Sequence, residues 1–95
     1  MTTTLRIEHG VTDFTRWKEM FDADPLERKT SGVRAYRVMR ANDDEARVTI
    51  DLDFDDAAKA RAMEARLREL WNGPASAMLT NASLKLWELV DVQVV

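Results

Sequence analysis

The sequence predicts one α+β domain over residues 1–95, with the element order strand, helix, strand, strand, helix, strand. Two periodicities lead to this prediction, because apolar residues alternate along four segments and recur at helical spacing along two others. The composition agrees, since 45% hydrophobic and 33% charged residues with only three glycines are typical of a folded domain with a single core. So short a chain also leaves apolar surface that a second copy can cover.

The first strand is expected at 4–9, where leucine and isoleucine alternate with charged residues. After Gly10 the apolar residues follow helical spacing and predict a helix over about 13–23. Thr12 or Asp13 can cap this helix, because either side chain accepts a hydrogen bond from a backbone N–H of the first turn.

A second helical start is expected at Asp24 and Pro25, since an acidic cap followed by proline suits the first turn of a helix. Gly32 is expected to end this helix. Two strands should follow at 33–41 and 46–54, and the turn-forming residues NDDE between them predict a hairpin.

A second long helix is expected over about 56–72, with Asp55 or Asp56 as its cap and an Asn-Gly-Pro sequence at its end. One further helical turn is expected around 77–79. The chain then closes with a β-prone segment over 84–95, in which aliphatic residues alternate with others.

Two interleaved strand–helix–strand units give the ferredoxin-like arrangement, a four-stranded antiparallel sheet with both helices on one face. The other face would stay bare, and its simplest cover is the same face of a second copy. We therefore expect a homodimer, in which the alternating tail VDVQVV (90–95) extends the sheet edge onto the partner subunit. The residues expected toward the helices are Leu5, Ile7, Val48, Ile50, Leu52 and Phe54, and those expected on the bare face are Arg6, Glu8, Thr49, Asp51, Asp53, Trp87, Tyr36, Val38 and Leu89.

Four phrases of the sequence are similar to those of a known family. They are H-x-V-x-D-F-x-x-W-K-x-x-F-D at 9–22, R-x-x-x-G-V at 28–33, YRVMR at 36–40 and F-D-D-x-x-x-A at 54–60. Together with the element order, they make nearly the whole chain resemble the dimeric α/β-barrel proteins, and among these the small antibiotic biosynthesis monooxygenase-like members.

The resemblance implies a homodimeric α/β barrel with a pocket between the helices and the sheet. The superfamily includes cofactor-independent monooxygenases that oxidise polyketide-like aromatics, polyketide cyclases, small-molecule isomerases and haem-degrading enzymes. Its monooxygenases have an Asn and a Trp one helical turn apart, whereas here the residue one turn before Trp71 is Leu67. The helical histidine of the haem-degrading members is also missing, so no cofactor is expected.

Candidate site residues follow from side-chain chemistry. The only histidine, His9, has the intrinsic pKa of a general base, and its alternative is an ordinary hydrogen bond to the adjoining loop. Arg37 shares a strand face with Ala35 and Met39. If that face turns to the helices, Arg37 lies in the pocket and can bind an oxyanion. If the register shifts by one, Tyr36 faces the pocket instead. Aromatic and methionine side chains can line a pocket or fill a core. The expected site comprises His9, Arg37 and Tyr36 as catalytic residues and Trp17, Met63, Trp71 and Met78 as the pocket wall.

Several classes of site are not expected. Asp51 and Asp53 share one face of a strand, and we interpret them as ion-pair partners of Arg6 and Arg47 rather than as a metal or acid/base pair. A net charge of −3 argues against nucleic acid, because phosphate-binding surfaces need clustered cations. The chain has no cysteine and no apolar run typical of a leader or a membrane span, so we expect a cytoplasmic protein.

Two functions stay open. The first is a monooxygenase-like enzyme or binder that handles a small apolar or aromatic molecule, with a polyketide cyclase or isomerase-like enzyme as a variant. The second is a non-catalytic dimeric module in which the same residues are core and interface. An enzyme needs a hollow between helices and sheet, of the order of several hundred Å³, whereas a module fills it.

Overall fold

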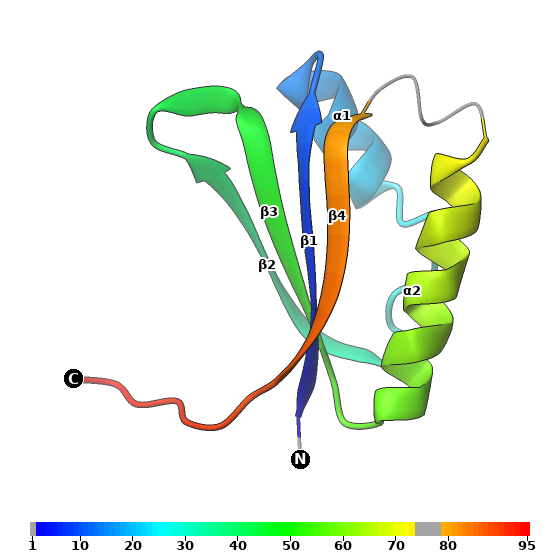
Figure 1. Cartoon of the computed structure of the whole chain (residues 1–95), viewed down its shortest axis with the longest axis vertical. Helices are drawn as coiled ribbons and strands as arrows, with labels where there is room; N and C mark the ends of the chain where they lie inside the picture. The colour runs from blue at the N-terminus through cyan, green and yellow to red at the C-terminus, as the bar shows by residue number, and fades with distance from the viewer. Residues whose placement is uncertain (1, 74–78) are drawn as a thin grey trace.

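The computed structural model describes residues 2–73 and 79–95. Its strands and helices follow the predicted order (Figure 1). The elements are β1 (Thr3–Val11), α1 (Phe14–Asp22), β2 (Val33–Ala41), β3 (Asp44–Phe54), α2 (Ala57–Trp71) and β4 (Leu79–Glu88).

The four strands form one sheet in the order β2-β3-β1-β4, and every neighbouring pair is antiparallel. Both helices lie on the same side of this sheet (Figure 1). The predicted ferredoxin-like α+β fold is therefore confirmed. In the part of the chain that is described, no helix is long and apolar enough to cross a membrane.

Both helices begin at an aspartate that satisfies a first-turn amide. The side chain of Asp13 accepts a hydrogen bond from the backbone N–H of Arg16, and Asp56 accepts one from Ala58. Two capping residues were predicted for each helix, and the structure uses the second of each pair, Asp13 for α1 and Asp56 for α2.

The segment between α1 and β2 is a series of turns, so the second helical start predicted at Asp24 and Pro25 is wrong. Asp24 and Glu27 have φ angles of 58° and 49°, and such left-handed backbone interrupts a right-handed helix. The carboxylate of Asp24 still accepts the backbone N–H of Arg28 at 2.9 Å. The capping signature thus stabilises a turn, and Gly32, at φ 100°, carries the chain into β2.

Several strand boundaries differ from the prediction, and β1 runs over Thr3–Val11 rather than 4–9. β3 begins at Asp44 rather than at 46, and β4 begins at Leu79 rather than at 84. Of the helical turn predicted around 77–79, residues 77 and 78 lie outside the described residues and Leu79 already belongs to β4. β4 ends at Glu88, so the alternating tail is not part of the sheet within one chain.

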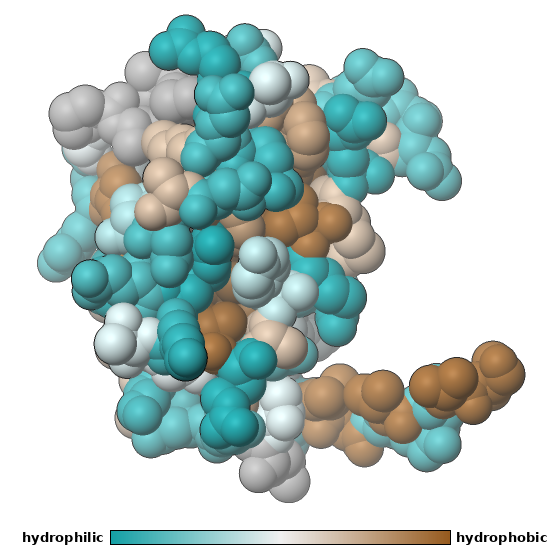
Figure 2. All heavy atoms as spheres, turned by 180° about the vertical axis from the view of Figure 1, so that it is seen from behind, coloured by the Kyte–Doolittle hydropathy of each residue, from teal (hydrophilic) through white to brown (hydrophobic). Residues whose placement is uncertain are grey.

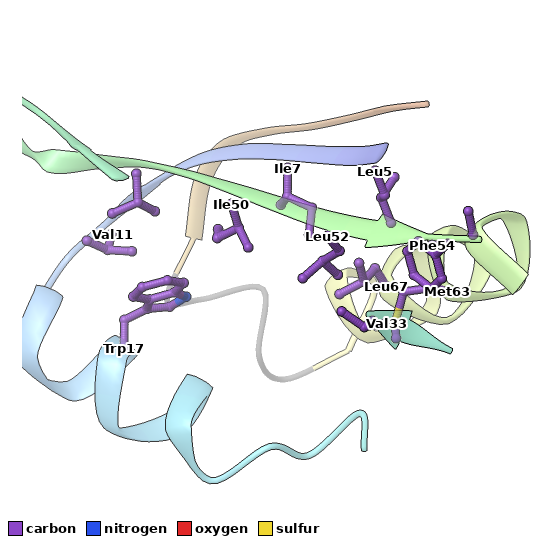
Figure 3. Close-up of a cluster of buried hydrophobic side chains, with 12 residues drawn as sticks. Leu5, Ile7, Val11, Trp17, Val33, Ile50, Leu52, Phe54, Met63 and Leu67 are labelled. Atoms are coloured by element: carbon purple, nitrogen blue, oxygen red, sulfur yellow. The ribbon is translucent and has the colours of Figure 1, made fainter. Parts of the chain in front are cut away.

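The core lies between the sheet and the helices (Figure 3). Strand residues point down from β1 and β3 and meet Met63 and Leu67 of α2 and Trp17 of α1. The helix-facing residues predicted for these two strands are all buried, which confirms their direction: Leu5, Ile7, Val48, Ile50, Leu52 and Phe54.

The direction predicted for β2 is wrong. Tyr36 pairs with Leu52 and Val38 with Ile50, so both lie on the helix side, whereas Arg37 pairs with Asp51 on the bare face. The cause is a register shift between Val33 and Ala35. One extra residue in a strand sends every later side chain to the other face.

The C-terminal residues after β4 extend from the body as an arm on the side of the sheet opposite the helices (Figure 1). Figure 2 shows this arm as a largely apolar projection beside a recess of the molecule. Val90 is 88% exposed and Val94 99%. The alternating valines of the arm are thus largely exposed to solvent in a single chain.

Candidate functional site

A pocket lies between the sheet and the helices and has a cavity volume of about 110 Å³. Its wall combines β1 and β3 with α1, α2, the turns that follow α1 and the first residue of β4. The wall is apolar except for His9 and Arg28. The lining residues are Ile7, His9, Trp17, Met20, Phe21, Pro25, Leu26, Arg28, Ile50, Leu52, Leu67, Leu70, Trp71 and Leu79.

His9 is buried in this wall, with 3% of its surface exposed. Its Nδ1 lies 3.1 Å from the carbonyl oxygen of Gly10, and because a carbonyl only accepts, Nδ1 carries the proton and Nε2 the lone pair. Burial lowers the pKa of His9 below its usual value, and the charge of Arg47 lowers it further, against the opposing effect of the Gly10 carbonyl. His9 is therefore neutral at pH 7 and basic at Nε2.

The two tryptophans predicted as pocket wall both contact the ring of His9. The ring centres of His9 and Trp17 are 5.4 Å apart, those of His9 and Trp71 are 6.3 Å apart, and both contacts are edge-to-face. Trp17 also stacks on Phe21 at 5.3 Å. The first turn of α1 and the last residue of α2 thus each bring a tryptophan ring to His9.

Arg28 is a wall residue that the sequence did not single out as functional. Its guanidinium lies 4.0 Å from the ring centre of Phe21 and 4.7 Å from that of Tyr36. It donates to the carbonyl oxygen of Phe21 at 2.8 Å and pairs with the carboxylate of Asp24 at 3.3 Å. In the sequence, Arg28 begins the phrase R-x-x-x-G-V and stands at i,i+4 from Asp24, and neither pattern points to the pocket.

Some of the predicted site residues are not brought together. Tyr36 is outside the pocket wall and contacts it through Phe21 and Arg28. Met63 is buried with Ala60 on the part of α2 that fills the core. Arg37 lies across the sheet on the bare face, and Met78 lies outside the described residues.

Arg37 instead belongs to an ion-pair cluster on the bare face. Arg6 donates twice to the carboxylate of Asp51, at 2.8 and 2.9 Å, and Arg37 donates once at 2.8 Å. Asp51 is only 1% exposed. The hydrogen bond from Arg6 and then that from Arg37 hold the pKa of Asp51 below its usual value, although burial acts in the opposite direction.

The predicted pairing of Asp51 with Arg6 is thus confirmed, but Arg47 has a different partner. Arg47 donates to the carbonyl oxygen of Asn81 at 3.3 Å. Asp53 accepts a hydrogen bond from the hydroxyl of Thr4 at 2.6 Å. Both carboxylates therefore have structural partners on the face that does not line the pocket.

A comparison of the sequence with protein-family models gives no match, and a comparison with curated proteins gives none either. Solved structures do match. A cofactor-independent oxygenase, SnoaB from Streptomyces nogalater, superposes with a TM-score of 0.76 at 15% identity, over 96% of this chain and 95% of that one.

Two other solved structures extend the likeness. PA3566 from Pseudomonas aeruginosa matches with a TM-score of 0.70 at 14% identity, over 95% of both chains. A dimeric ferredoxin-like protein from an uncultured marine organism matches with a TM-score of 0.62 at 20% identity, over 98% of both chains. At these identities the likeness concerns the fold, and this chain accordingly has the ferredoxin-like fold that these proteins share.

Proposed function

We propose that the protein binds a small apolar or aromatic molecule in the pocket and that His9 acts on it as a general base. The observation that carries the proposal is a neutral, buried imidazole in contact with Trp17 and Trp71, in a wall whose other polar residue is Arg28. A base within such a wall is what removal of a proton from an aromatic hydroxyl or an activated C–H requires.

Monooxygenase-like chemistry is the reaction class that we favour. An oxygenase without a cofactor must make its organic substrate reactive toward O₂, and deprotonation does so because the anion gives up an electron more easily. SnoaB, described as a cofactor-independent oxygenase, has the same fold. A cyclase or isomerase would use the same base without consuming O₂.

The volume of the pocket supports a second candidate, the non-catalytic dimeric module. A cavity of about 110 Å³ is below the roughly 300 Å³ at which ligand pockets commonly begin. It has room for about four water molecules. A ligand must therefore be small, of the size of a single aromatic ring, and a pocket that takes none would be a loosely filled core.

Binding and turnover of phenol and its alkyl derivatives test these alternatives. Quenching of the fluorescence of Trp17 and Trp71 reports binding, and an oxygen electrode with product analysis reports turnover. We expect binding in the wild type, and we expect His9→Gln to lower turnover by about 10²–10⁴-fold, the usual contribution of a general base.

Arg61→Gln, on the exposed surface of α2, is the matched control and should leave both readings unchanged. Rearranged product without oxygen uptake would favour the cyclase or isomerase class. Absence of any fluorescence change with the whole series would instead favour the module.

The same proposal includes a homodimer formed by the bare faces of two sheets. Trp87 is 46% exposed on that face, and Met39 is exposed beside β3. Cations and anions are interspersed there, as Arg6 and Glu8 illustrate, so two copies can meet without net repulsion. One structural neighbour is described as dimeric. Light scattering should give a mass near twice 10.9 kDa.

A further inference from the structure

A β-bulge lies in β4 beside His9. Glu8 of β1 pairs with Ser83, and Gly10 pairs with Thr80, so the register shifts between these two positions. One β1 residue, His9, consequently stands opposite residues 81–82 of β4. A bulge bends its strand and disrupts the ladder locally, and His9 accordingly has no paired residue in β4.

The bulge is centred on Asn81 and is held by one hydrogen bond. Asn81 has a φ of 48°, a left-handed conformation that asparagine tolerates better than most residues. Its carbonyl oxygen accepts a hydrogen bond at 3.3 Å from Arg47 of β3, the strand on the other side of β1. The strained residue is therefore anchored by a side chain from β3.

Gly10 is the residue on which the bulge rests. A Cβ at Gly10 would overlap the hydroxyl oxygen of Thr80, whereas the Cβ of Thr80 itself would stand at an ordinary 3.6 Å. The branched side chain of threonine has few rotamers with which to avoid the overlap. A side chain at residue 10 would therefore require either a new rotamer of Thr80 or a wider separation of β1 and β4.

The same residue supplies the hydrogen-bond partner of the histidine. The carbonyl oxygen of Gly10 accepts the Nδ1 proton of His9, so the position of the Gly10 peptide sets the tautomer of the ring. The other polar wall residue, Arg28, is already bound to Phe21 and Asp24. Nε2 is then the acceptor that the wall offers to a ligand.

We propose that Gly10 and Asn81, the residue at the bulge, are positioning residues that hold His9 in the Nδ1-protonated tautomer. As a consequence, the pocket selects an aromatic ring with a hydroxyl donor over the same ring without one. The selectivity rests on the proposed function. The tautomer does not, because it is a property of the ligand-free protein.

Nitrogen NMR of the imidazole tests the tautomer directly, since His9 is the only histidine and its signals need no assignment. In the wild type Nε2 should resonate as a pyridine-type nitrogen and Nδ1 as a pyrrole-type nitrogen. Gly10→Ala should shift both signals toward the averaged values of a mixed tautomer. A pyrrole-type Nε2 in the wild type would overturn the proposal.

Two further variants separate positioning from general disturbance. Gly10→Ala combined with Thr80→Ala removes the overlapping hydroxyl and should restore the wild-type signals. Gly73→Ala, where a Cβ would meet its nearest atom at 3.4 Å, should not change them. Unchanged signals in Gly10→Ala, or failure of the double variant to restore them, would contradict the role of Gly10.

If Gly10→Ala does not fold, Asn81→Val provides the same test from the other strand. Valine disfavours the left-handed backbone, so the bulge should rearrange and the two nitrogen signals should again approach each other. Signals identical to those of the wild type would show that the bulge does not control the ring.

Phenol and anisole test the selectivity, because anisole has the ring without the hydroxyl donor. One neutral hydrogen bond makes roughly a three- to tenfold difference in affinity, so phenol should bind more tightly by that factor. Gly10→Ala should abolish the preference. Equal binding of the two by the wild type would overturn the selectivity, while binding of neither would overturn the proposed function and leave the tautomer result standing.

Discussion

Burial keeps His9 neutral but also makes it a weaker base, because it lowers the pKa of the imidazole. Within the described residues its hydrogen-bond partner is a backbone carbonyl and not a carboxylate. Without a carboxylate to stabilise the imidazolium, His9 is suited to protons that are already acidic, such as those of phenols, and not to activating a serine-like nucleophile.

The lowered pKa of His9 predicts a dependence of stability on pH. Between the lower pKa of the folded state and the unfolded value of about 6.5, only the unfolded chain binds a proton at this residue. The contribution of His9 to the free energy of unfolding should therefore be at its full value above about pH 6.5. It should decrease as the pH falls toward the pKa of the folded state.

Urea unfolding at about pH 7.5 and 5.5 measures this effect, since a shift of one pKa unit corresponds to about 1.4 kcal/mol. His9→Gln should show a smaller decrease between the two pH values than the wild type does. The lowered pKa of Asp51 matters only at more acidic pH and does not interfere. Equal decreases in both proteins would contradict the prediction.

At the scale of elements, the sequence predicted β1 and β3 correctly and β2 incorrectly, and the difference has a physical cause. β1 and β3 pair with each other in register throughout, so local alternation alone decides which side chains are buried. In β2 a bulge at Arg34 reverses the faces. Because Tyr36 and Val38 on one face and Ala35 and Met39 on the other are all apolar or small, alternation could not reveal the reversal.

The pocket was predictable to the extent that its parts are local. His9, Trp17 and Trp71 follow from a strand end and two helical faces, and the structure brings them together. The place of Arg28 in the pocket wall could not be predicted, because it depends on the approach of β2 to the end of α1. Long-range contacts of this kind leave no periodic trace in a sequence.

Arg28→Lys tests whether this residue joins α1 to β2. Lysine keeps the charge but loses the planar group that stacks on Phe21 and Tyr36, so we expect a loss of about 1 kcal/mol in the free energy of unfolding. Urea denaturation measures it, with Arg61→Lys as the matched exposed control. Comparable losses in the two variants would show that the stacking does not contribute.

At the scale of the whole molecule, the arm after β4 is the part least explained by a single chain. Its apolar side chains are exposed, and a projecting, alternating segment of this kind invites pairing with another chain. In the proposed homodimer the arm lies along the sheet edge of the partner subunit, where its main-chain groups find hydrogen bonds.

Removal of residues 91–95 should therefore weaken the dimer. Burial of one valine contributes about 1.5 kcal/mol or more, so the dissociation constant should rise by at least about tenfold. Light scattering over a dilution series measures it, and Gln93→Ala in the intact chain is the control. An unchanged dilution curve would exclude the arm from the interface.

The alternation of β1 has a consequence for how such a protein can diverge. Ile7 and His9 face the pocket, while Arg6 belongs to the opposite face with its ion-pair cluster. If the proposed pocket and homodimer hold, substitutions at Ile7 or His9 would alter the ligand, while substitutions at Arg6 would alter the contact with the partner subunit. Within this strand of nine residues, ligand and assembly could therefore diverge separately, except at Gly10, where the two faces are linked through the hydrogen bond to His9.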